Sequence, residues 1–181
     1  MEKIKIVNDR GFTLVEMIVV MIIMACVATI ALWGFQKQIK STSIRTQTSD
    51  LYADLLSAQI NALTKKRTYF VVFGATTYDI YEDTSPTPNG NGTLETASDQ
   101  KLGGFPKTTK YNISLLGGDG TTACGTTISF DTQGLASVYQ AIVRFNFTST
   151  EVQPEYDCIT IDKTRILKGA WDSANTVCAT K

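Results

Sequence analysis

The chain begins with a short polar stretch and then continues through a long block of apolar residues. Within residues 17–35 the thiol of Cys26 is the only ionisable side chain. A helix of this length covers about 30 Å, the thickness of the hydrocarbon layer of a bilayer. A helix in the core of a soluble protein would carry a polar stripe, and this block has none. The pattern predicts a membrane-spanning helix over residues 12–35, with Glu16 as its one acid.

Residues 36–64 are predicted to continue the helix with a different pattern. No proline or glycine interrupts residues 36–63, and the polar residues are now distributed along the segment. Two adjoining apolar stripes follow steps of three and four residues: Leu51, Leu55, Ala58 and Ala62 in one, and Tyr52, Leu56, Ile60 and Leu63 in the other. This half is therefore predicted to be an amphipathic helix that lies against a sheet, with Ser, Thr and Gln facing outwards.

After Thr64 the apolar residues alternate with a period of two, which is typical of strands. Segments rich in β-branched and aromatic residues are predicted as strands: residues 68–73, 77–82, 111–116, 126–131, 141–147 and 158–162. Residues 158–168 are predicted as a hairpin that turns at Lys163 and Thr164, and residues 84–104 as a loop without core-forming content. Residues 65–181 thus form an antiparallel sheet domain, and the predicted fold is α+β.

The composition restricts the chemistry of the chain. Its 181 residues suit one domain with an attached segment, and 17 Lys and Arg balance 17 Asp and Glu, which disfavours a nucleic-acid partner. The absence of histidine excludes Ser-His, Cys-His and His-ligated zinc sites. A membrane-anchored periplasmic enzyme is the alternative from another class, but no triad or paired-carboxylate motif is evident. We therefore predict no enzyme, no catalytic residue and no cofactor.

Residues 1–11 form a short leader ahead of the apolar block. A secretory signal would place its small-residue cleavage site after the block, and residues 41–43 leave that alternative open. The conspicuous small residue of the leader, Gly11, lies before the block instead. Cations on the two sides of the block balance, so charge counting does not orient the helix. The position of Gly11 favours a membrane anchor over a removed signal.

The segment Arg10-Gly11-Phe12-Thr13-Leu14-Val15-Glu16, followed by the apolar block, resembles the processing site of type IV prepilins and type II secretion pseudopilins. The resemblance implies cleavage between Gly11 and Phe12 by a prepilin peptidase, followed by N-methylation of Phe12. It implies a single-pass protein of the bacterial inner membrane with a periplasmic C-terminal domain, whose helix over residues 12–35 later forms the core of a pseudopilus or pilus filament. The implied partners are other pilin or pseudopilin subunits, the prepilin peptidase/methyltransferase and, indirectly, an inner-membrane platform protein and an assembly ATPase.

Glu16 is the candidate assembly residue. A carboxylate within an apolar helix is costly unless it is paired. Cleavage after Gly11 would give Phe12 a free cationic amine in the same stretch of chain. In a bundle with an axial stagger, Glu16 of one subunit can meet the amine of a neighbour, so that correct register is rewarded. The alternative is a hydrated carboxylate at the level of the lipid headgroups.

A second, looser resemblance lies in the predicted sheet domain. Residues 128–134 (ISFDTQG), followed by a strand and a hairpin that ends in residues 165–169 (RILKG), are similar to H-type minor pseudopilins and minor fimbrial pilins. The resemblance implies a structural minor subunit of a type II secretion pseudopilus. The alternative is a minor type IV pilin that acts in pilus initiation, adhesion or DNA uptake.

The cysteines fit an exported protein. Cys26 lies in the apolar block and is interpreted as a packing residue. The other three have no C-x-x-C spacing, so a zinc cluster is not predicted, and in an oxidising periplasm two of them would pair. We predict a disulfide between Cys158 and Cys178, which would hold the last residues of the chain. Cys124 is the alternative partner for either.

Two further groups of charged residues are weaker candidates. Asp119, Asp157 and Asp162 could join backbone carbonyls around a calcium ion, but they lack the spacing of an EF-hand, so no metal is predicted. Three cations crowd the last predicted hairpin, where DNA could bind: Lys163, Arg165 and Lys168. Acids and bases are equal in number over residues 155–181, which again disfavours nucleic acid.

Overall fold

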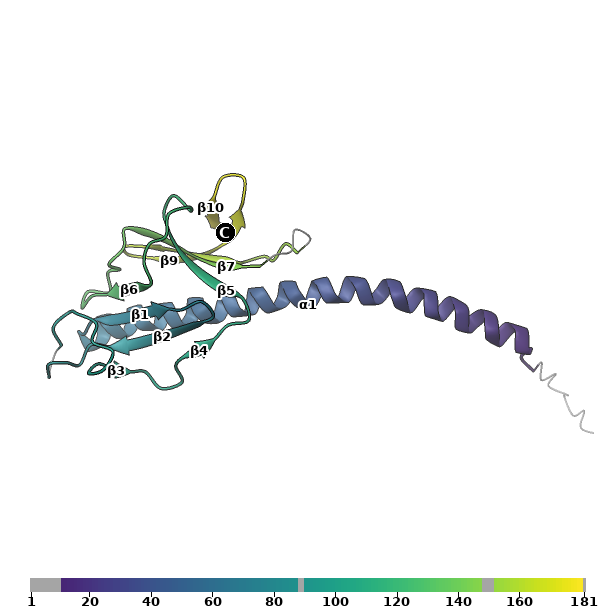
Figure 1. Cartoon of the computed structure of the whole chain (residues 1–181), viewed down its shortest axis with the longest axis horizontal. Coiled ribbons are helices and arrows are strands. Elements are labelled where there is room, and N and C mark those ends of the chain that lie inside the picture. The colour runs from purple at the N-terminus through teal and green to yellow at the C-terminus, as the bar shows by residue number, and fades with distance from the viewer. Residues whose placement is uncertain (1–10, 88–89, 148–151, 181) are drawn as a thin grey trace, which may run out of the picture. The chain divides into compact units, whose positions relative to one another are not determined.

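The structure is a computed structural model, which describes residues 11–87, 90–147 and 152–180, without the side chains of residues 30–34. The described residues form one helix and ten strands (Figure 1). Helix α1 is Leu14–Lys65. The strands are β1 (Tyr69–Phe73), β2 (Thr77–Glu82), β3 (Gln100–Lys101), β4 (Lys107–Thr108), β5 (Asn112–Gly117), β6 (Thr127–Phe130), β7 (Gln140–Asn146), β8 (Cys158–Asp162), β9 (Ile166–Asp172) and β10 (Val177–Thr180). The chain divides into two compact units, and the boundary lies between Ile39 and Lys40.

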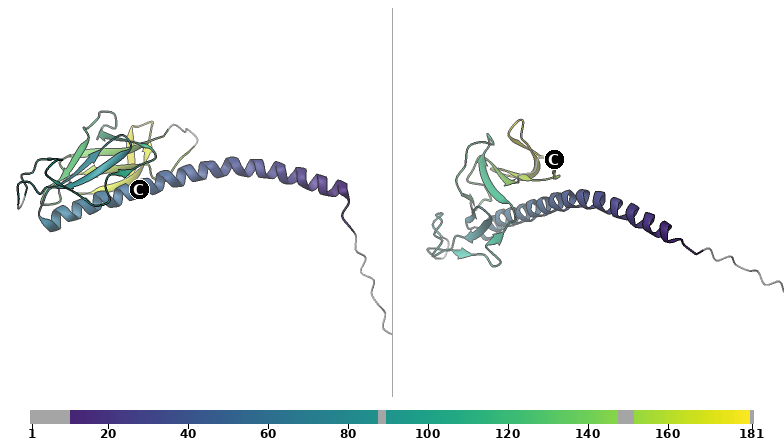
Figure 2. Two further views of the ribbon diagram at one scale, coloured as in Figure 1. Left: turned by 60° about the horizontal axis from the view of Figure 1, so that its bottom comes forward. Right: turned by 45° about the vertical axis from the view of Figure 1, so that its right-hand side comes forward.

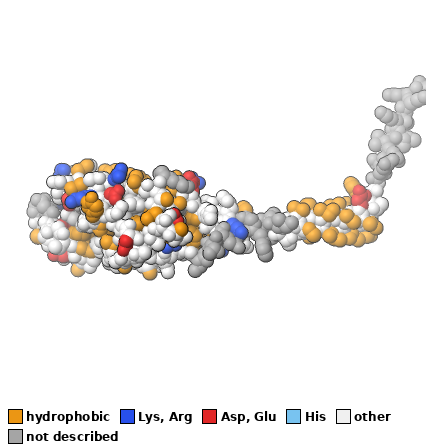
Figure 3. Space-filling view, turned by 90° about the horizontal axis from the view of Figure 1, so that it is seen from above, with side chains coloured by type: hydrophobic (Ala, Val, Ile, Leu, Met, Phe, Trp, Pro, Cys, Tyr) orange, Lys and Arg blue, Asp and Glu red, His pale blue; other side chains and the backbone are white. Residues whose placement is uncertain are grey.

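The first unit contains the first half of helix α1. Its apolar side chains are exposed, with 76% of Leu14 and 71% of Met21 accessible to solvent. Figure 3 shows hydrophobic side chains gathered over this half of the helix. Within the described part of the chain, no helix combines the length and the apolar character needed to cross a membrane. The predicted leader, except Gly11, and the side chains of residues 30–34 in the predicted span lie outside the described residues.

The second half of helix α1 packs on strands, as predicted. The first predicted stripe is buried almost completely: Leu51, Leu55, Ala58 and Ala62. In the second stripe, by contrast, Ile60 and Leu63 are about half exposed, because the sheets cover one stripe of the helix and not both. The prediction that the threonines face outwards is wrong at Thr48. Its side chain is fully buried, and its hydroxyl donates to the carbonyl of Ile44 at 2.9 Å.

The strands form two five-stranded sheets, both antiparallel wherever strands pair (Figure 2). In the first sheet the order is β3-β2-β1-β6, and β4 pairs with β2; in the second it is β10-β9-β8-β7-β5. The predicted α+β fold is confirmed, but the single sheet that we expected is divided in two. The second half of α1 shares one apolar core with both sheets, since Leu55, Val71 and Ile159 belong to the same buried cluster.

Alternation along the second sheet gives it two different faces. On β8, Ile159 and Ile161 belong to the core that is shared with the helix. The neighbouring Cys158 belongs instead to a separate, smaller cluster with Ile142 and Cys178. Because successive side chains of a strand point to opposite faces, this smaller cluster lies on the face turned away from the helix. We call it the outer face of the second sheet.

The long loop between β2 and β3 has more internal structure than its sequence predicts. Asp83 and Asp99 are buried, and their carboxylates accept backbone hydrogen bonds from the loop. The amide of Gly92 donates to Asp83 at 2.6 Å, and the amide of Glu95 donates to Asp99 at 2.7 Å. Two carboxylates therefore organise a segment that has few apolar side chains.

Candidate functional site

The helix begins at the residues that the sequence predicts for processing and assembly. Thr13 precedes the first helical residue, and its hydroxyl accepts a hydrogen bond from the amide of Glu16 at 3.2 Å. The carbonyl of Thr13 accepts from the amide of Met17, also at 3.2 Å. Thr13 is thus the N-cap of α1 and satisfies a backbone donor that has no partner within the helix.

Glu16 lies in the first turn of the helix, three residues after this cap, and is exposed. A Thr-x-x-Glu pattern at a helix start is the sequence signature of a capping box, a signal that our sequence analysis did not use. The position also places a carboxylate at the positive end of the helix dipole. The position of Glu16 therefore suits a local role at the start of its own helix, beside the role in assembly that the sequence predicts.

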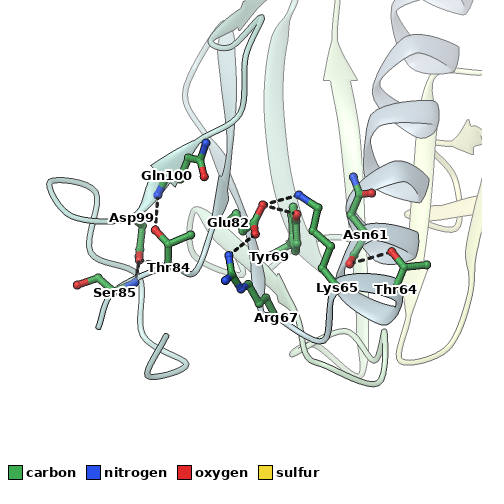
Figure 4. A network of polar contacts seen from close by, with 10 residues as sticks. All are labelled: Asn61, Thr64, Lys65, Arg67, Tyr69, Glu82, Thr84, Ser85, Asp99 and Gln100. Atoms are coloured by element: carbon green, nitrogen blue, oxygen red, sulfur yellow. Dashed lines mark hydrogen bonds and ion pairs between the residues drawn. The ribbon is translucent and has the colours of Figure 1, made fainter. Parts of the chain in front are cut away.

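The other end of the helix is tied to the first sheet by a buried carboxylate. Helix α1 ends at Lys65, and Lys66 follows in the left-handed conformation, with φ of 57°. Glu82, at the end of β2, is 5% exposed. Figure 4 shows three side chains directed at its carboxylate, from Lys65, Arg67 and the hydroxyl of Tyr69, each at 2.7 Å.

These contacts decide the ionisation of Glu82. Burial by itself would raise the pKa of Glu82, but the hydrogen bonds from Lys65, Tyr69 and Arg67 together lower it below its usual value. The same contact with Glu82 raises the pKa of Lys65. The cluster is therefore an ionised carboxylate held by two cations, and it joins the helix end to β1 and β2.

A second polar cluster holds the middle of the docked helix. Asp54 accepts hydrogen bonds from the hydroxyl of Tyr78 at 2.6 Å and from the ammonium group of Lys107 at 2.7 Å. Burial first, and then the nearby Asp54 carboxylate, raise the pKa of Tyr78 above its usual value. Tyr78 lies on β2 and Lys107 on β4, so one helical carboxylate binds two strands of the first sheet.

The three cations of the last hairpin do not form one patch. Lys168 points to the helix side, where its ammonium lies 5.1 Å from the ring centre of Tyr52 and 4.9 Å from that of Tyr156. Such cation–π contacts hold a lysine in place as part of the packing. Lys163 and Arg165 are exposed at the turn between β8 and β9.

The structure contains a disulfide between Cys158 on β8 and Cys178 on β10. It lies on the outer face of the second sheet and is packed against Ile142, Leu116 and Trp171. The two remaining cysteines are free thiols, of which Cys26 is exposed and Cys124 is half-buried. Cys124 packs against the shared core and takes no part in the bridge.

A charged pair lies beside the disulfide. The guanidinium of Arg144 stacks over the ring of Trp171 at 4.4 Å, and Asp157 accepts a hydrogen bond from the amide of Trp171 at 2.6 Å. Burial raises the pKa of Asp157, an effect that the Trp171 amide and the charge of Arg144 only partly oppose. These contacts continue the ladder between β8 and β9 beyond Cys158.

The three acids considered for calcium have separate local partners. Asp119 accepts hydrogen bonds from the amides of Thr121 and Thr122, and Asp157 binds Trp171 as described. Asp162 lies 3.6 Å from Arg165. Among the described residues, no group of three or more His, Cys, Asp or Glu side chains is arranged to hold a metal ion.

Comparison with known proteins identifies a similarity at the N-terminus. Residues 6–32 match the prokaryotic N-terminal methylation motif. Neither the curated proteins nor the solved structures contain a match to the chain. The motif includes the predicted cleavage position, the Thr13 cap, Glu16 and most of the apolar block. The chain therefore carries the N-terminal signal of type IV pilin-like proteins, which supports a type IV prepilin-like protein.

Proposed function

We propose that this protein is a structural subunit of a type IV pilin-like filament and not an enzyme. The observation that carries the proposal is the match of residues 6–32 to the methylation motif, placed directly on the start of a 52-residue helix. In this proposal the first half of α1 holds the precursor in the bacterial inner membrane as a single pass. After cleavage between Gly11 and Phe12 and methylation of Phe12, the same apolar surface packs against neighbouring subunits.

The exposed side chains of the first half of α1 support this use. Large apolar side chains such as Leu14 and Met21 have no cover within the described chain, which is the expected state for a surface that is buried in lipid or in a helix bundle. The second half of α1 is docked on the sheets. The surfaces of the sheet domain that are turned away from the helix are therefore left to contact other molecules. Glu16 would pair with the amine of a neighbouring Phe12.

We further propose that the filament is a type II secretion pseudopilus in which the chain is a minor subunit. The support is the similarity of residues 128–134 and of the last hairpin to H-type pseudopilins. In the structure these residues form β6 and a turn in which Asp131 accepts from the amide of Leu135 at 2.9 Å. A minor type IV pilin shares these features.

Mass spectrometry of the N-terminus of the purified chain tests the first proposal. We expect loss of residues 1–11 and one added methyl group on Phe12. An intact N-terminus, or a cut near residue 43, would remove the chain from the filament proteins. Deletion of the gene separates the two filament types, because loss of protein secretion with normal pili supports a pseudopilus, whereas loss of pili with normal secretion supports a pilus.

A further inference from the structure

One tyrosine of the sheet domain differs from all the others in exposure. The chain has seven tyrosines, and six of them are buried or half-buried. Tyr139 is 86% exposed, although it directly precedes β7. An exposed aromatic ring offers a large and rigid apolar surface to a partner, because burial of that surface would be favourable.

The backbone around Tyr139 is held in place on both sides. Val138 packs against the shared core, and Ala141 is fully buried. Tyr139 therefore lies between two packed positions and not in a loose segment. The ring has a defined position at one end of the second sheet.

Tyr139 borders a depression of about 530 Å³, which is also lined by Gln140, Asp162, Lys163, Thr164 and Arg165. Gln140 and Asp162 are opposite residues of β7 and β8. The turn that carries the cations is rigid, because the amide of Asp162 donates to the carbonyl of Arg165 and the amide of Ala136 donates to that of Lys163, both at 2.9 Å. The side-chain amide of Gln59 on the helix donates to the carbonyl of Thr164 at 3.4 Å.

The two cations of the depression are available to a partner. Arg165 is 71% exposed, and its contact with Asp162 is long, at 3.6 Å. Lys163 has no side-chain hydrogen bond or ion pair within the part of the chain that the structure describes. Two cations face one acid, so the surface has a net positive charge. A rigid turn with an exposed Tyr and Arg has the composition of a protein-interface hot spot.

We propose that this depression, the Tyr139 groove, binds an acidic segment of another protein, with carboxylates on Lys163 and Arg165 and an apolar side chain on the ring of Tyr139. A protein segment fits better than nucleic acid. Two cations are few for a polyanion whose affinity depends on many phosphate contacts, whereas a short peptide segment needs only one or two ion pairs. The groove belongs to the second unit, so binding does not depend on cleavage at Gly11 or on filament assembly.

The test is fluorescence anisotropy with the purified full chain in a non-ionic detergent and empty micelles as the blank. The probe is a labelled octapeptide in which four glutamates alternate with four residues that are glycine or leucine. The same peptide with glutamine for glutamate is the uncharged control, and a single-stranded oligothymidine is the nucleic-acid control. We expect saturable binding of the acidic peptide only.

Variants then locate the binding. Lys163→Glu with Arg165→Glu should weaken binding at least about tenfold, and Tyr139→Ala should weaken it several-fold. A second double variant, Lys163→Gln with Arg165→Gln, removes the charges without reversing them. It should give a similar loss of binding, and it replaces the first variant if that one unfolds. The matched control is Lys110→Glu, because Lys110 is exposed and its amide binds Gln47, three helical turns from Gln59.

Several results would overturn the proposal. These are no saturable binding of the acidic peptide, an equal loss in Lys110→Glu, or tighter binding of the oligothymidine. Equal binding of the glutamine peptide would also overturn it, because the cations would then have no part in recognition. Binding of a lysine peptide to the Lys163→Glu, Arg165→Glu variant would support it.

Discussion

Cys158 and Cys178 are joined across a strand that separates them in the sheet. β9 lies between β8 and β10, yet the Cα atoms of the two cysteines are 6.0 Å apart. In a flat sheet two strand spacings amount to about 9.5 Å. The second sheet therefore curls sharply at its last hairpin, and the disulfide closes this curl over the residue opposite Cys158, which is Gly169.

Removal of the disulfide should lower the stability of the sheet domain without changing its fold. The bridge joins residues 20 positions apart, and closure of a loop of this size stabilises a folded chain by about 3 kcal/mol. We expect the Cys158→Ala, Cys178→Ala variant to show that loss in urea unfolding of the full chain in detergent. Cys124→Ala, which removes a free thiol, is the control and should lose much less. Equal losses in the two variants would show that the bridge has no particular effect.

The curl of the second sheet leaves no room for a side chain at Gly169. A Cβ atom at this position would lie 2.8 Å from the sulfur of Cys178 and closer still to the carbonyl oxygen of Ala179. Gly169→Ala should therefore destabilise the domain by about 1–3 kcal/mol, the usual cost of overpacking. Gly103→Ala is the matched control, since nothing lies within 4 Å of its added Cβ. Unchanged thermal unfolding of Gly169→Ala would mean that the hairpin is more open than the structure shows.

Glu82 should make stability depend on acid pH. Because its folded-state pKa is lowered, its contribution is complete above the pKa of an unfolded glutamate, about 4.3, and is lost as the pH falls through the folded-state value. At neutral pH, Glu82→Gln should cost roughly 2 kcal/mol, as expected for hydrogen bonds to a charged group. The difference in unfolding free energy between the natural chain and the variant should shrink below about pH 4.

The control for Glu82 is an exposed ion pair of the same chemistry. Glu155 lies 3.2 Å from Arg45, and both side chains are about half exposed. Glu155→Gln should change the unfolding free energy by less than about 1 kcal/mol at any pH. A difference for Glu82→Gln that stays constant from neutral to acid pH would contradict the ionised state of Glu82.

Periodicity was sufficient to predict the elements that bury apolar stripes. Leu51 and Leu55 follow helical steps, and Ile159 and Ile161 follow strand steps, so burial on one side explains their spacing. The same rule cannot place residues whose partners are distant in sequence. β10 is four residues long with one buried side chain, Cys178, and only its pairing with β9 makes it a strand.

Polar residues were the hardest to predict, because their burial depends on donors supplied by the backbone. Asp83 and Asp99 look like loop acids in the sequence but are surrounded by loop amides. Lys168 was grouped with the cations of the turn, whereas alternation along β9 directs it towards Tyr52 on the helix. Tyr139 resembled any other aromatic residue at a strand start, and only the structure shows that its ring is exposed.

The two roles of Glu16 can be separated by comparing two substitutions at the start of α1. A role in capping depends on the Thr13 hydroxyl, which accepts from the backbone amide of Glu16, so Thr13→Val removes the cap, whereas glutamine at position 16 still suits a capping box. A role in pairing with the amine of a neighbouring Phe12 depends on the carboxylate charge. Glu16→Gln keeps the size and the polar character of the side chain and removes only that charge.

If pairing dominates, Glu16→Gln should abolish incorporation into filaments, measured by cross-linking and shearing of cells, while Thr13→Val reduces it only modestly. Both variants should still be inserted and processed, which the N-terminal mass confirms. A severe defect in Thr13→Val together with normal incorporation of Glu16→Gln would instead assign the start of the helix to capping and would contradict the pairing.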